Sequence, residues 1–292
     1  MPESRKTTPK YDLGGCSITL LDGGGLKLDG GAMFGIIPKP LWVRSTPADH
    51  MNRIQLACNC LLVEWNRETD RRVILETGHG HKYETKEQNF YDIDPQRWLM
   101  HGLRQANVDP ATITDVVVSH LHFDHAGGLT HEHDGRLMPT FPKAKVHVQK
   151  QEYEDAVAGF GTMKITYRGE NIQPLDELDA WRLHDGEAEI VPGIRLSPTP
   201  GHTRGHQAVI VAGHDRTAIF PGDAMPTAAH SGAPYNMAYD LYPLENRESK
   251  GRFLSRAAEE DWLICADHEV HTPIMRAAPE KNWFTLTPAP AD

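Results

Sequence analysis

Residues 119–128 of this 292-residue chain read Ser-His-Leu-His-Phe-Asp-His-Ala-Gly-Gly, and they decide the fold. They follow the apolar run Asp-Val-Val-Val at 115–118, which is typical of a buried β-strand. His120 and His122 are two positions apart, so in extended backbone their side chains point to the same side. The stretch therefore predicts a strand that ends in a pair of imidazoles with a shared direction.

Asp124 and His125 add a carboxylate and a further imidazole after the chain turns. Imidazole and carboxylate together suit zinc or a similar divalent ion. The four side chains are too close in sequence to converge on one ion, so two adjacent ions are the simpler arrangement. The alternative is a histidine-rich polar loop, since the chain has 17 histidines. The order His-x-His-x-Asp-His after a β-branched run favours the metal site.

Composition limits the class of protein. Hydrophobic residues make up 39% of the chain, enough to bury a sizeable core in one large domain or two small ones. The net charge of -10 argues against a nucleic-acid partner, because such proteins usually present a basic face. No apolar run approaches the roughly 20 residues of a membrane span. The polar start of the chain predicts no signal peptide, so we expect a cytoplasmic protein without a membrane partner and with buried, reduced cysteines.

The rest of the chain alternates between strand and helix patterns. A first strand at 16–21 is expected to end at the glycines of 22–25. Asp94 as N-cap and Pro95 at the first helical position predict a helix over 94–106. We expect further strands at 53–65, 72–76, 145–148, 187–191, 194–197, 207–211, 217–220 and 262–266, the last of the chain, and helices starting near 151 and over 244–258.

Three later motifs also place chemically active side chains directly after predicted strands. Residues 199–206 read Thr-Pro-Gly-His-Thr-Arg-Gly-His, residues 221–223 read Pro-Gly-Asp, and residues 267–269 read Asp-His-Glu. Upstream, Glu76 begins a Glu-Thr-Gly-His element at the end of another strand. Each of these could be an ordinary turn when taken alone. Their order along the chain, together with the central stretch, indicates a single site.

In order and type, these motifs resemble those of the metallo-β-lactamase superfamily, over roughly residues 50–270. The resemblance implies an α+β fold, a four-layer αββα sandwich of two mixed β-sheets with helices outside. It implies a single domain over 1–292, with 1–10 and about 280–292 as tails. It also implies two divalent ions, the first held by His120, His122 and His202, the second by Asp124, His125 and His268, with Asp223 bridging both.

Several neighbouring residues have alternative roles. His271 competes with His268 for the second ion, and His206 is expected to be structural or to support a ligand. Glu76 stands where the superfamily typically has aspartate, and we expect it to support the metal site from outside. His79 and His81 form another His-x-His pair, but without an acidic partner at the right spacing they are expected to be loop histidines.

The implied ions account for the expected chemistry, which is hydrolysis. A water or hydroxide between two divalent metals has a lowered pKa and is a nucleophile near neutral pH, and one metal polarises the scissile oxygen. Asp124 orients this nucleophile and passes a proton to the leaving group. Zn²⁺ is the expected ion, and Mn²⁺, Fe²⁺ and Co²⁺ stay open because ligand type alone does not separate them.

The whole pattern is most similar to lactonase-like members, including the quorum-quenching acyl-homoserine lactonases, so the expected substrate is a small-molecule lactone. Those lactonases have a tyrosine three residues after the bridging aspartate, where this chain has Pro226. His230, Tyr235 or Tyr239 is the candidate replacement. In the variable region at 159–181, which precedes the motif at 199–206, the candidate substrate-wall residues are Phe160, Met163, Tyr167 and Trp181.

Other functions remain open within the same resemblance. Esterase, phosphoesterase, thioesterase and β-lactam-hydrolysing activities are alternatives, and a metal-stabilised binding protein is the non-enzyme alternative. Structural zinc sites are usually closed and rich in cysteine, whereas this set contains histidine and aspartate alone, which favours an open catalytic site. The sequence leaves the oligomeric state open; by analogy with relatives, a homodimer is one candidate, with residues 30–50 as its candidate contact.

Overall fold

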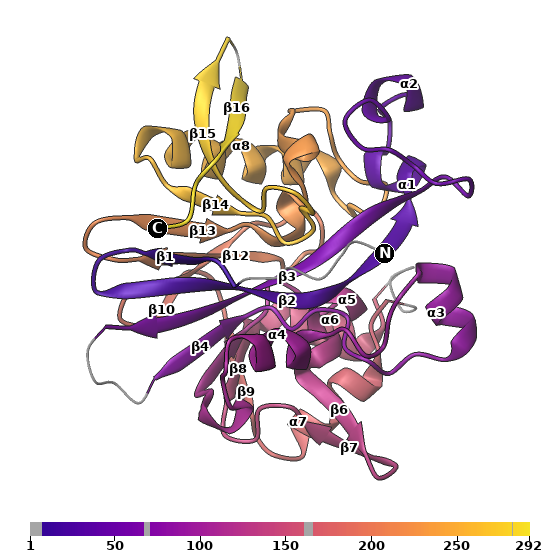
Figure 1. Cartoon of the computed structure of the whole chain (residues 1–292), viewed down its shortest axis with the longest axis vertical. Coiled ribbons are helices and arrows are strands. Elements are labelled where there is room, and N and C mark those ends of the chain that lie inside the picture. The colour runs from indigo at the N-terminus through magenta and orange to yellow at the C-terminus, as the bar shows by residue number, and fades with distance from the viewer. Residues whose placement is uncertain (1–7, 67–70, 161–165, 282) are drawn as a thin grey trace.

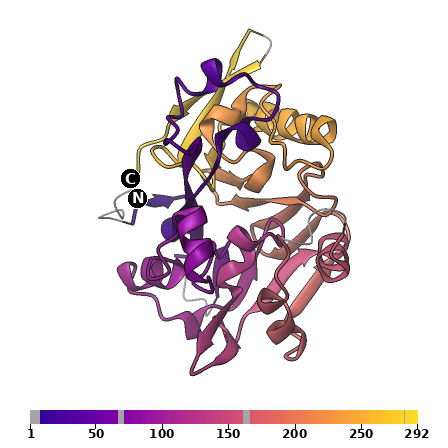
Figure 2. The same cartoon turned by 90° about the vertical axis from the view of Figure 1, so that its right-hand side faces the viewer.

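The computed structural model describes residues 8–66, 71–160, 166–281 and 283–292. Two seven-stranded sheets pack face to face, and helices cover their outer sides (Figure 1). The part of the chain coloured orange to yellow, from about residue 200 to the C-terminus, lies above most of the rest, and the view turned by 90° shows the same arrangement (Figure 2). This four-layer αββα sandwich confirms the predicted fold class.

The first sheet has the strand order β1-β2-β3-β4-β5-β8-β9. Its first four strands pair antiparallel, and β4, β5, β8 and β9 run parallel to one another. Parallel neighbours need crossover connections, which here contain the helices of one outer layer. The strands are β1 (Lys10–Asp12), β2 (Cys16–Asp29), β3 (Arg53–Trp65), β4 (Arg72–Leu75), β5 (Asp115–Val117), β8 (Lys145–Gln149) and β9 (Trp181–His184).

The second sheet has the order β10-β11-β12-β13-β14-β15-β16, with one parallel pair, β13 and β14. Its strands are β10 (Ala188–Val191), β11 (Ile194–Pro198), β12 (Gln207–Ala212), β13 (Thr217–Phe220), β14 (Leu263–Cys265), β15 (Ile274–Glu280) and β16 (Trp283–Pro288). A separate hairpin is formed by β6 (Thr130–His133) and β7 (Arg136–Pro139).

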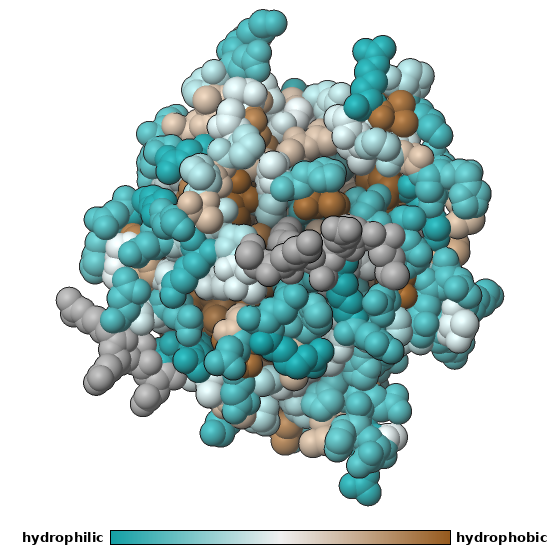
Figure 3. Space-filling model, viewed as in Figure 1, coloured by the Kyte–Doolittle hydropathy of each residue, from teal (hydrophilic) through white to brown (hydrophobic). Residues whose placement is uncertain are grey.

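The helices are short except for one. The α-helices are α1 (Gly30–Phe34), α2 (Lys39–Trp42), α3 (Thr85–Tyr91), α4 (Leu99–Gln105), α5 (Phe123–Ala126), α6 (Lys150–Ala158), α7 (Gln173–Asp176) and α8 (Pro243–Glu259). In the described part of the chain, no helix has the length and apolar character that crossing a bilayer needs. The face seen in Figure 3 is mostly hydrophilic, with small hydrophobic groups between.

Successive side chains of a strand pack into different layers of the sandwich. Val117 of β5 belongs to the core between the two sheets, together with residues such as Val209 and Phe220 of the second sheet. Its neighbour Val116 points the other way and packs in the core under the helices of the first sheet. Because successive side chains of a strand face opposite sides, one apolar run supplies two cores.

The structure corrects the predicted end of the first strand. β2 continues through the glycines to Asp29, and its register against β3 shifts between Asp22 and Gly25. Gly24 has φ +103°, which a side chain disfavours, and a Cβ at Gly23 would lie 2.6 Å from the carbonyl oxygen of Cys58. The glycines therefore form a bulge that brings two backbones together, because a bulge absorbs an extra residue without ending the strand.

Two helix and strand boundaries also differ from the prediction. α4 begins at Leu99 with Trp98 as N-cap, because the Asp94 carboxylate instead accepts a hydrogen bond from the Gln96 amide in a preceding turn, at 2.9 Å. The predicted C-terminal tail is wrong, since β15 and β16 form an antiparallel pair that reaches Pro288. At the N-terminal end, residues 1–7 of the predicted tail lie outside the described residues, and Lys10 already belongs to β1. Met163, a predicted substrate-wall residue, also lies outside the described residues.

Candidate metal centre

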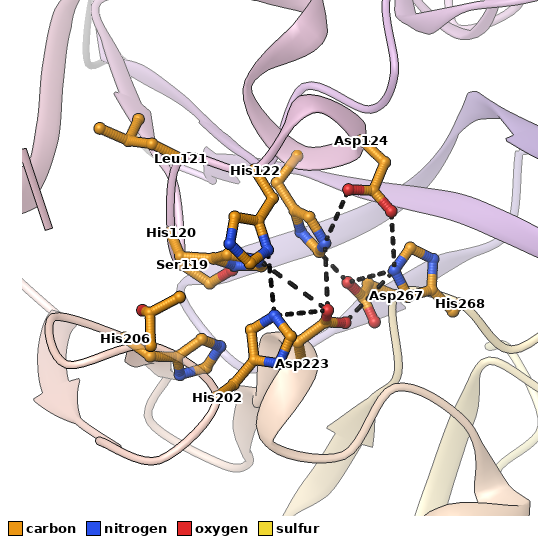
Figure 4. Close-up of polar contacts among 12 residues, drawn as sticks. Ser119, His120, Leu121, His122, Asp124, His202, His206, Asp223, Asp267 and His268 are labelled. Carbon is orange, nitrogen blue, oxygen red and sulfur yellow. Dashed lines mark hydrogen bonds and ion pairs between the residues drawn. The ribbon is translucent and has the colours of Figure 1, made fainter. Parts of the chain in front are cut away.

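The loops that follow β5, β11, β13 and β14 meet at one edge of the sandwich. His120 and His122 follow β5, and Asp124 and His125 lie in α5. The remaining three predicted ligands, His202, Asp223 and His268, come from the other three loops, and the seven side chains converge (Figure 4). Loops held by a rigid sheet edge are well suited to fixing such an array.

Two groups of side chains have the spacing of metal sites. In the first, His120, His122, His202 and Asp223 each offer one ligand atom, all within 4.8 Å of one another. The Nε2 atom of His202 lies 3.1 Å from the Nδ1 atom of His122 and 3.1 Å from Asp223 Oδ2. The second group contains His125, Asp223, Asp267 and His268.

Asp223 belongs to both groups and presents one oxygen to each. Its Oδ2 atom faces His202 at 3.1 Å, and its Oδ1 atom lies 3.3 Å from His268 Nε2. Asp124 stands on the second side, with its oxygens 3.6 Å from His268 Nε2 and 3.8 Å from His125 Nε2. The arrangement fits the expected bridging role of Asp223 and the expected place of Asp124.

Buried atoms without partners indicate what the site holds. Among the described residues, His120 Nε2, His125 Nε2 and Asp223 Oδ1 are buried and accept or donate no hydrogen bond. Leaving such groups buried and unpaired costs free energy, and far more when they are charged. Two divalent cations would satisfy all of them, so the residues present fit a binuclear metal centre.

The electrostatics of the site also favour cations. Burial and the neighbouring histidines hold the pKa values of His120 and His122 well below the usual range, so both rings are neutral and have a lone pair available. Burial lowers the pKa of His125 and of His268 as well, but the surrounding carboxylates, Asp124, Asp223 and Asp267 among them, raise both well above the usual value. The second site is thus strongly anionic and attracts cations.

The other ring nitrogen of most ligand histidines is fixed by a neighbour. His202 Nδ1 lies 2.9 Å from Asp240 Oδ1, and His268 Nδ1 lies 2.7 Å from the Ala57 carbonyl oxygen. Such partners set the tautomer and orientation of each ring, which raises metal affinity. No local pattern points to Asp240, which lies 38 residues beyond its partner in the chain.

Glu76 lies behind the centre, as expected for a supporting residue. One carboxylate oxygen accepts a hydrogen bond of 2.6 Å from the Ser119 amide, and the other is 3.4 Å from His125 Nδ1. Glu76 has φ +64°, a conformation uncommon for a residue with a side chain. The turn therefore directs this carboxylate under the loop after β5, which carries the first two imidazoles.

The alternative histidines have other partners or lie outside the cluster. His271 is exposed, whereas His268 is buried within the cluster. His206 donates or accepts at Nδ1 with the Thr199 hydroxyl at 2.8 Å, and burial lowers its pKa to about 3. His79 is bound to the backbone of two glycines, and His81 stacks on Trp98, so both are structural.

A cavity of about 350 Å³ opens over the ligands. Five of the predicted metal ligands line it, and apolar side chains such as Met33, Met237 and Phe90 form its walls. Phe90 and Met51 are 66% and 49% exposed, so apolar surface continues to the rim. A cavity with a polar floor and apolar walls suits a small molecule that has a polar reacting group and an apolar substituent.

Three residues were candidates to replace the missing tyrosine: His230, Tyr235 and Tyr239. Of these, Tyr239 is the one that lines the cavity, as far as the described residues show. Burial, with nearby carboxylates such as Asp29, raises the pKa of Tyr239 to about 12, so its hydroxyl remains a proton donor near neutral pH. The structure corrects the prediction for the other two. His230 uses Nδ1 with Thr227 and Nε2 with the Met33 carbonyl, and Tyr235 packs edge-on against Phe34.

The predicted substrate walls are also corrected. Trp181 and Tyr167 belong to the core under the helices, and Phe160 packs under the Arg204 guanidinium. None of the three is among the described residues that line the cavity, whereas Thr166 is. The aromatic side chains of this region were needed for the core, which is where aromatic residues usually lie.

Two further buried acids were missed as site residues. Asp267, next to His268, lies against the second group of ligands. Glu152 of α6 accepts hydrogen bonds from the Leu121 amide and the Thr203 hydroxyl, which are neighbours of metal ligands in two different loops. Only the adjacency of Asp267 to His268 was visible in the sequence. All four cysteines are buried and unpaired, as expected.

Known proteins resemble this chain in sequence and in fold. An N-acyl homoserine lactonase of Bacillus sp. is 36% identical over 113 residues, which cover 39% of this chain and 38% of that protein. The chain thus matches about two fifths of the length of that curated relative. Among solved structures, a probable metal-dependent hydrolase from Staphylococcus aureus is 28% identical with a TM-score of 0.85, covering 96% of this chain and 100% of that one.

A dizinc quorum-quenching lactonase with its product bound is 17% identical, with a TM-score of 0.79 over 97% of this chain and 98% of that one, a likeness in fold alone. The family model of the metallo-β-lactamase superfamily matches residues 53–268, which is most of the chain. That match includes every predicted metal ligand, from the loop after β5 to His268. The chain belongs to the metallo-β-lactamase superfamily.

Proposed function

We propose that this protein is a binuclear metal-dependent hydrolase that opens lactones with an apolar substituent, such as acyl-homoserine lactones. The observation that carries the proposal is the position of Asp223. It lies on the floor of the cavity and presents one carboxylate oxygen to each of two groups of ligands. A substrate on this floor meets both groups at once.

The bound ions would supply a nucleophilic water of lowered pKa and polarise the substrate carbonyl oxygen. The chain's own residues do the rest. Asp124 lines the cavity beside His268, where its carboxylate receives a proton from the nucleophile and delivers it to the ring oxygen as the lactone opens. Tyr239, still protonated near neutral pH, donates a hydrogen bond to the carbonyl oxygen.

The apolar walls bind the substituent. Met33 of α1 and Met237 come from segments far apart in the chain, which lie side by side because the Ala238 amide donates to the Ala32 carbonyl at 2.8 Å. Methionine side chains are flexible and fill irregular space, so such walls accept acyl groups of different shape. The N-acyl homoserine lactonase named above, 36% identical over 113 residues, supports the choice of a lactone as the substrate.

The test is a substrate panel on the metal-loaded protein. The panel contains an acyl-homoserine lactone, a simple aliphatic lactone, a nitrophenyl ester, a thioester, a phosphodiester and a β-lactam. We expect the highest kcat/KM on the lactone with the apolar acyl chain. A preference for the phosphodiester or the thioester would leave the binuclear chemistry in place and overturn the substrate.

A variant of the cavity wall tests the position of the acyl chain independently of the metal centre. Met237→Ala enlarges the cavity on the acyl side without touching a predicted ligand. It should raise KM for long-chain acyl lactones while kcat on the aliphatic lactone changes little. Equal effects on both substrates would contradict the proposed orientation of the acyl chain.

A further inference from the structure

Asp267 is a buried carboxylate with no hydrogen-bond partner. It follows β14 directly and is 2% exposed. Among the described residues, neither of its side-chain oxygens has a hydrogen-bond partner. An ionised carboxylate in such a place is costly unless a cation lies beside it. The side chain points toward the metal ligands, beside His268 (Figure 4).

Its position is comparable with that of Asp124, a predicted ligand of the second ion. The Oδ2 atom of Asp267 lies 3.6 Å from His268 Nε2, the same distance that separates this nitrogen from Oδ2 of Asp124. Asp267 also belongs to the group of four residues whose ligand atoms all lie within 4.8 Å. We propose that Asp267 is an additional ligand of the second ion, beyond the seven residues of the superfamily pattern.

A competing role for Asp267 would be to orient His125 from behind, because its Oδ2 atom lies 3.3 Å from His125 Nδ1. Glu76 Oε2 lies 3.4 Å from the same nitrogen, and the other Glu76 oxygen is anchored by the Ser119 amide. Among the described residues, Glu76 Oε2 and Asp267 Oδ2 are both buried without a hydrogen-bond partner. One ring N–H can serve only one of these two oxygens, and Glu76 is the carboxylate that its anchor fixes behind His125, so a cation is what would satisfy Asp267.

This ligand makes the two sites chemically different. The first ion has three imidazoles and the shared carboxylate of Asp223. The second has two imidazoles and three carboxylates, those of Asp124, Asp223 and Asp267. Nitrogen-rich sets of low coordination number suit Zn²⁺, while oxygen-rich sets with more ligands favour harder ions such as Mn²⁺. The second site therefore favours Mn²⁺ more strongly, relative to Zn²⁺, than the first does.

The test measures metal binding rather than turnover, and it rests on the binuclear centre proposed above. Metal-free protein is titrated with Zn²⁺ and with Mn²⁺, with bound Mn²⁺ read by its electron paramagnetic resonance signal. The variant is Asp267→Asn, and the matched control is Glu76→Gln, which alters the other carboxylate beside His125. Thermal unfolding of the metal-free forms checks that both variants fold.

We expect Asp267→Asn to weaken Mn²⁺ binding at the second site by at least about tenfold, and to weaken Zn²⁺ binding there much less. Glu76→Gln should weaken both ions by a similar factor, because it acts through the orientation of His125. If Asp267→Asn leaves Mn²⁺ affinity within twofold of wild type, or lowers both affinities equally, Asp267 is not a ligand. Fewer than two ions on the wild-type chain would instead refute the binuclear centre itself.

Discussion

Glu152 offers a test of how the ligand loops are held. It is fully buried in α6 and joins three segments. One carboxylate oxygen accepts from the Leu121 amide and the Tyr167 hydroxyl, both at 3.0 Å, and the other accepts from the Thr203 hydroxyl at 2.6 Å. Leu121 lies between His120 and His122, and Thr203 follows His202. One side chain thus ties together the loops that carry the first ion's imidazoles.

The expected cost follows from these bonds. Glu152→Ala leaves three buried donors without an acceptor, and each such group costs about 1–3 kcal/mol. We therefore expect the free energy of unfolding to fall by at least about 3 kcal/mol. Glu152→Gln keeps one acceptor oxygen, and its amide can donate to the Thr203 hydroxyl, so its loss should be about 1–2 kcal/mol.

Urea unfolding of the metal-free protein measures this loss without any contribution from metal binding. The matched control is Glu154→Ala on the same helix, where an exposed side chain 3.8 Å from Lys150 is worth less than about 0.5 kcal/mol. The altered loops should also weaken binding of the first ion more than the second. If Glu152→Ala loses no more stability than Glu154→Ala, the hydrogen bonds do not hold the loops.

Three other changes test neighbouring parts of the site. Tyr239→Phe should lower kcat on the best lactone by about a hundredfold, with Tyr235→Phe within twofold of wild type, because only Tyr239 lines the cavity among these two; equal rates for the two variants would remove the proposed donor. The pKa of Tyr239 is raised to about 12, and only the protonated hydroxyl donates, so its contribution to the rate should be lost only as the pH rises through 12. The rate ratio of wild type to Tyr239→Phe should therefore stay constant from pH 7 to 10. A ratio that falls within this range would show that Tyr239 ionises at a lower pH. Lys250→Met should lower the free energy of unfolding by about 3 kcal/mol in a denaturant titration, since the Lys250 ammonium donates to three backbone carbonyls of the loop between His230 and Tyr235; a loss below about 1 kcal/mol would show that the loop is held by other contacts.

Much of the fold followed from local pattern. The run at 115–118 and the ordered motifs predicted the strands that carry the ligands, because alternation and turn residues are local properties. The C-terminal hairpin escaped prediction because its register against β14 is decided by tertiary pairing. Met275 faces Pro288 across that hairpin and Ile264 on its other side, contacts that no local pattern encodes.

The site residues likewise fall into those that local motifs predict and those that only the folded chain brings together. The predicted ligands stand in short motifs, so their residue types and spacing were enough to place them. Asp240 and Glu152 act on loops 31 to 51 residues away in the chain, and their roles depend on the packing of α6 and α8. The choice among His230, Tyr235 and Tyr239 likewise depended on which side chain faces the cavity, and only the folded loop decides that.

The central claim is that two ions share Asp223. The most direct measurement is the metal content per chain of wild type and Asp223→Ala, after chelation, reloading with an excess of Zn²⁺ or Mn²⁺ and desalting. Wild type should retain about two ions, and the variant, without a carboxylate between the two groups, should retain clearly fewer and lose hydrolysis. One ion or none on wild type, or two ions and full activity on Asp223→Ala, would contradict the account.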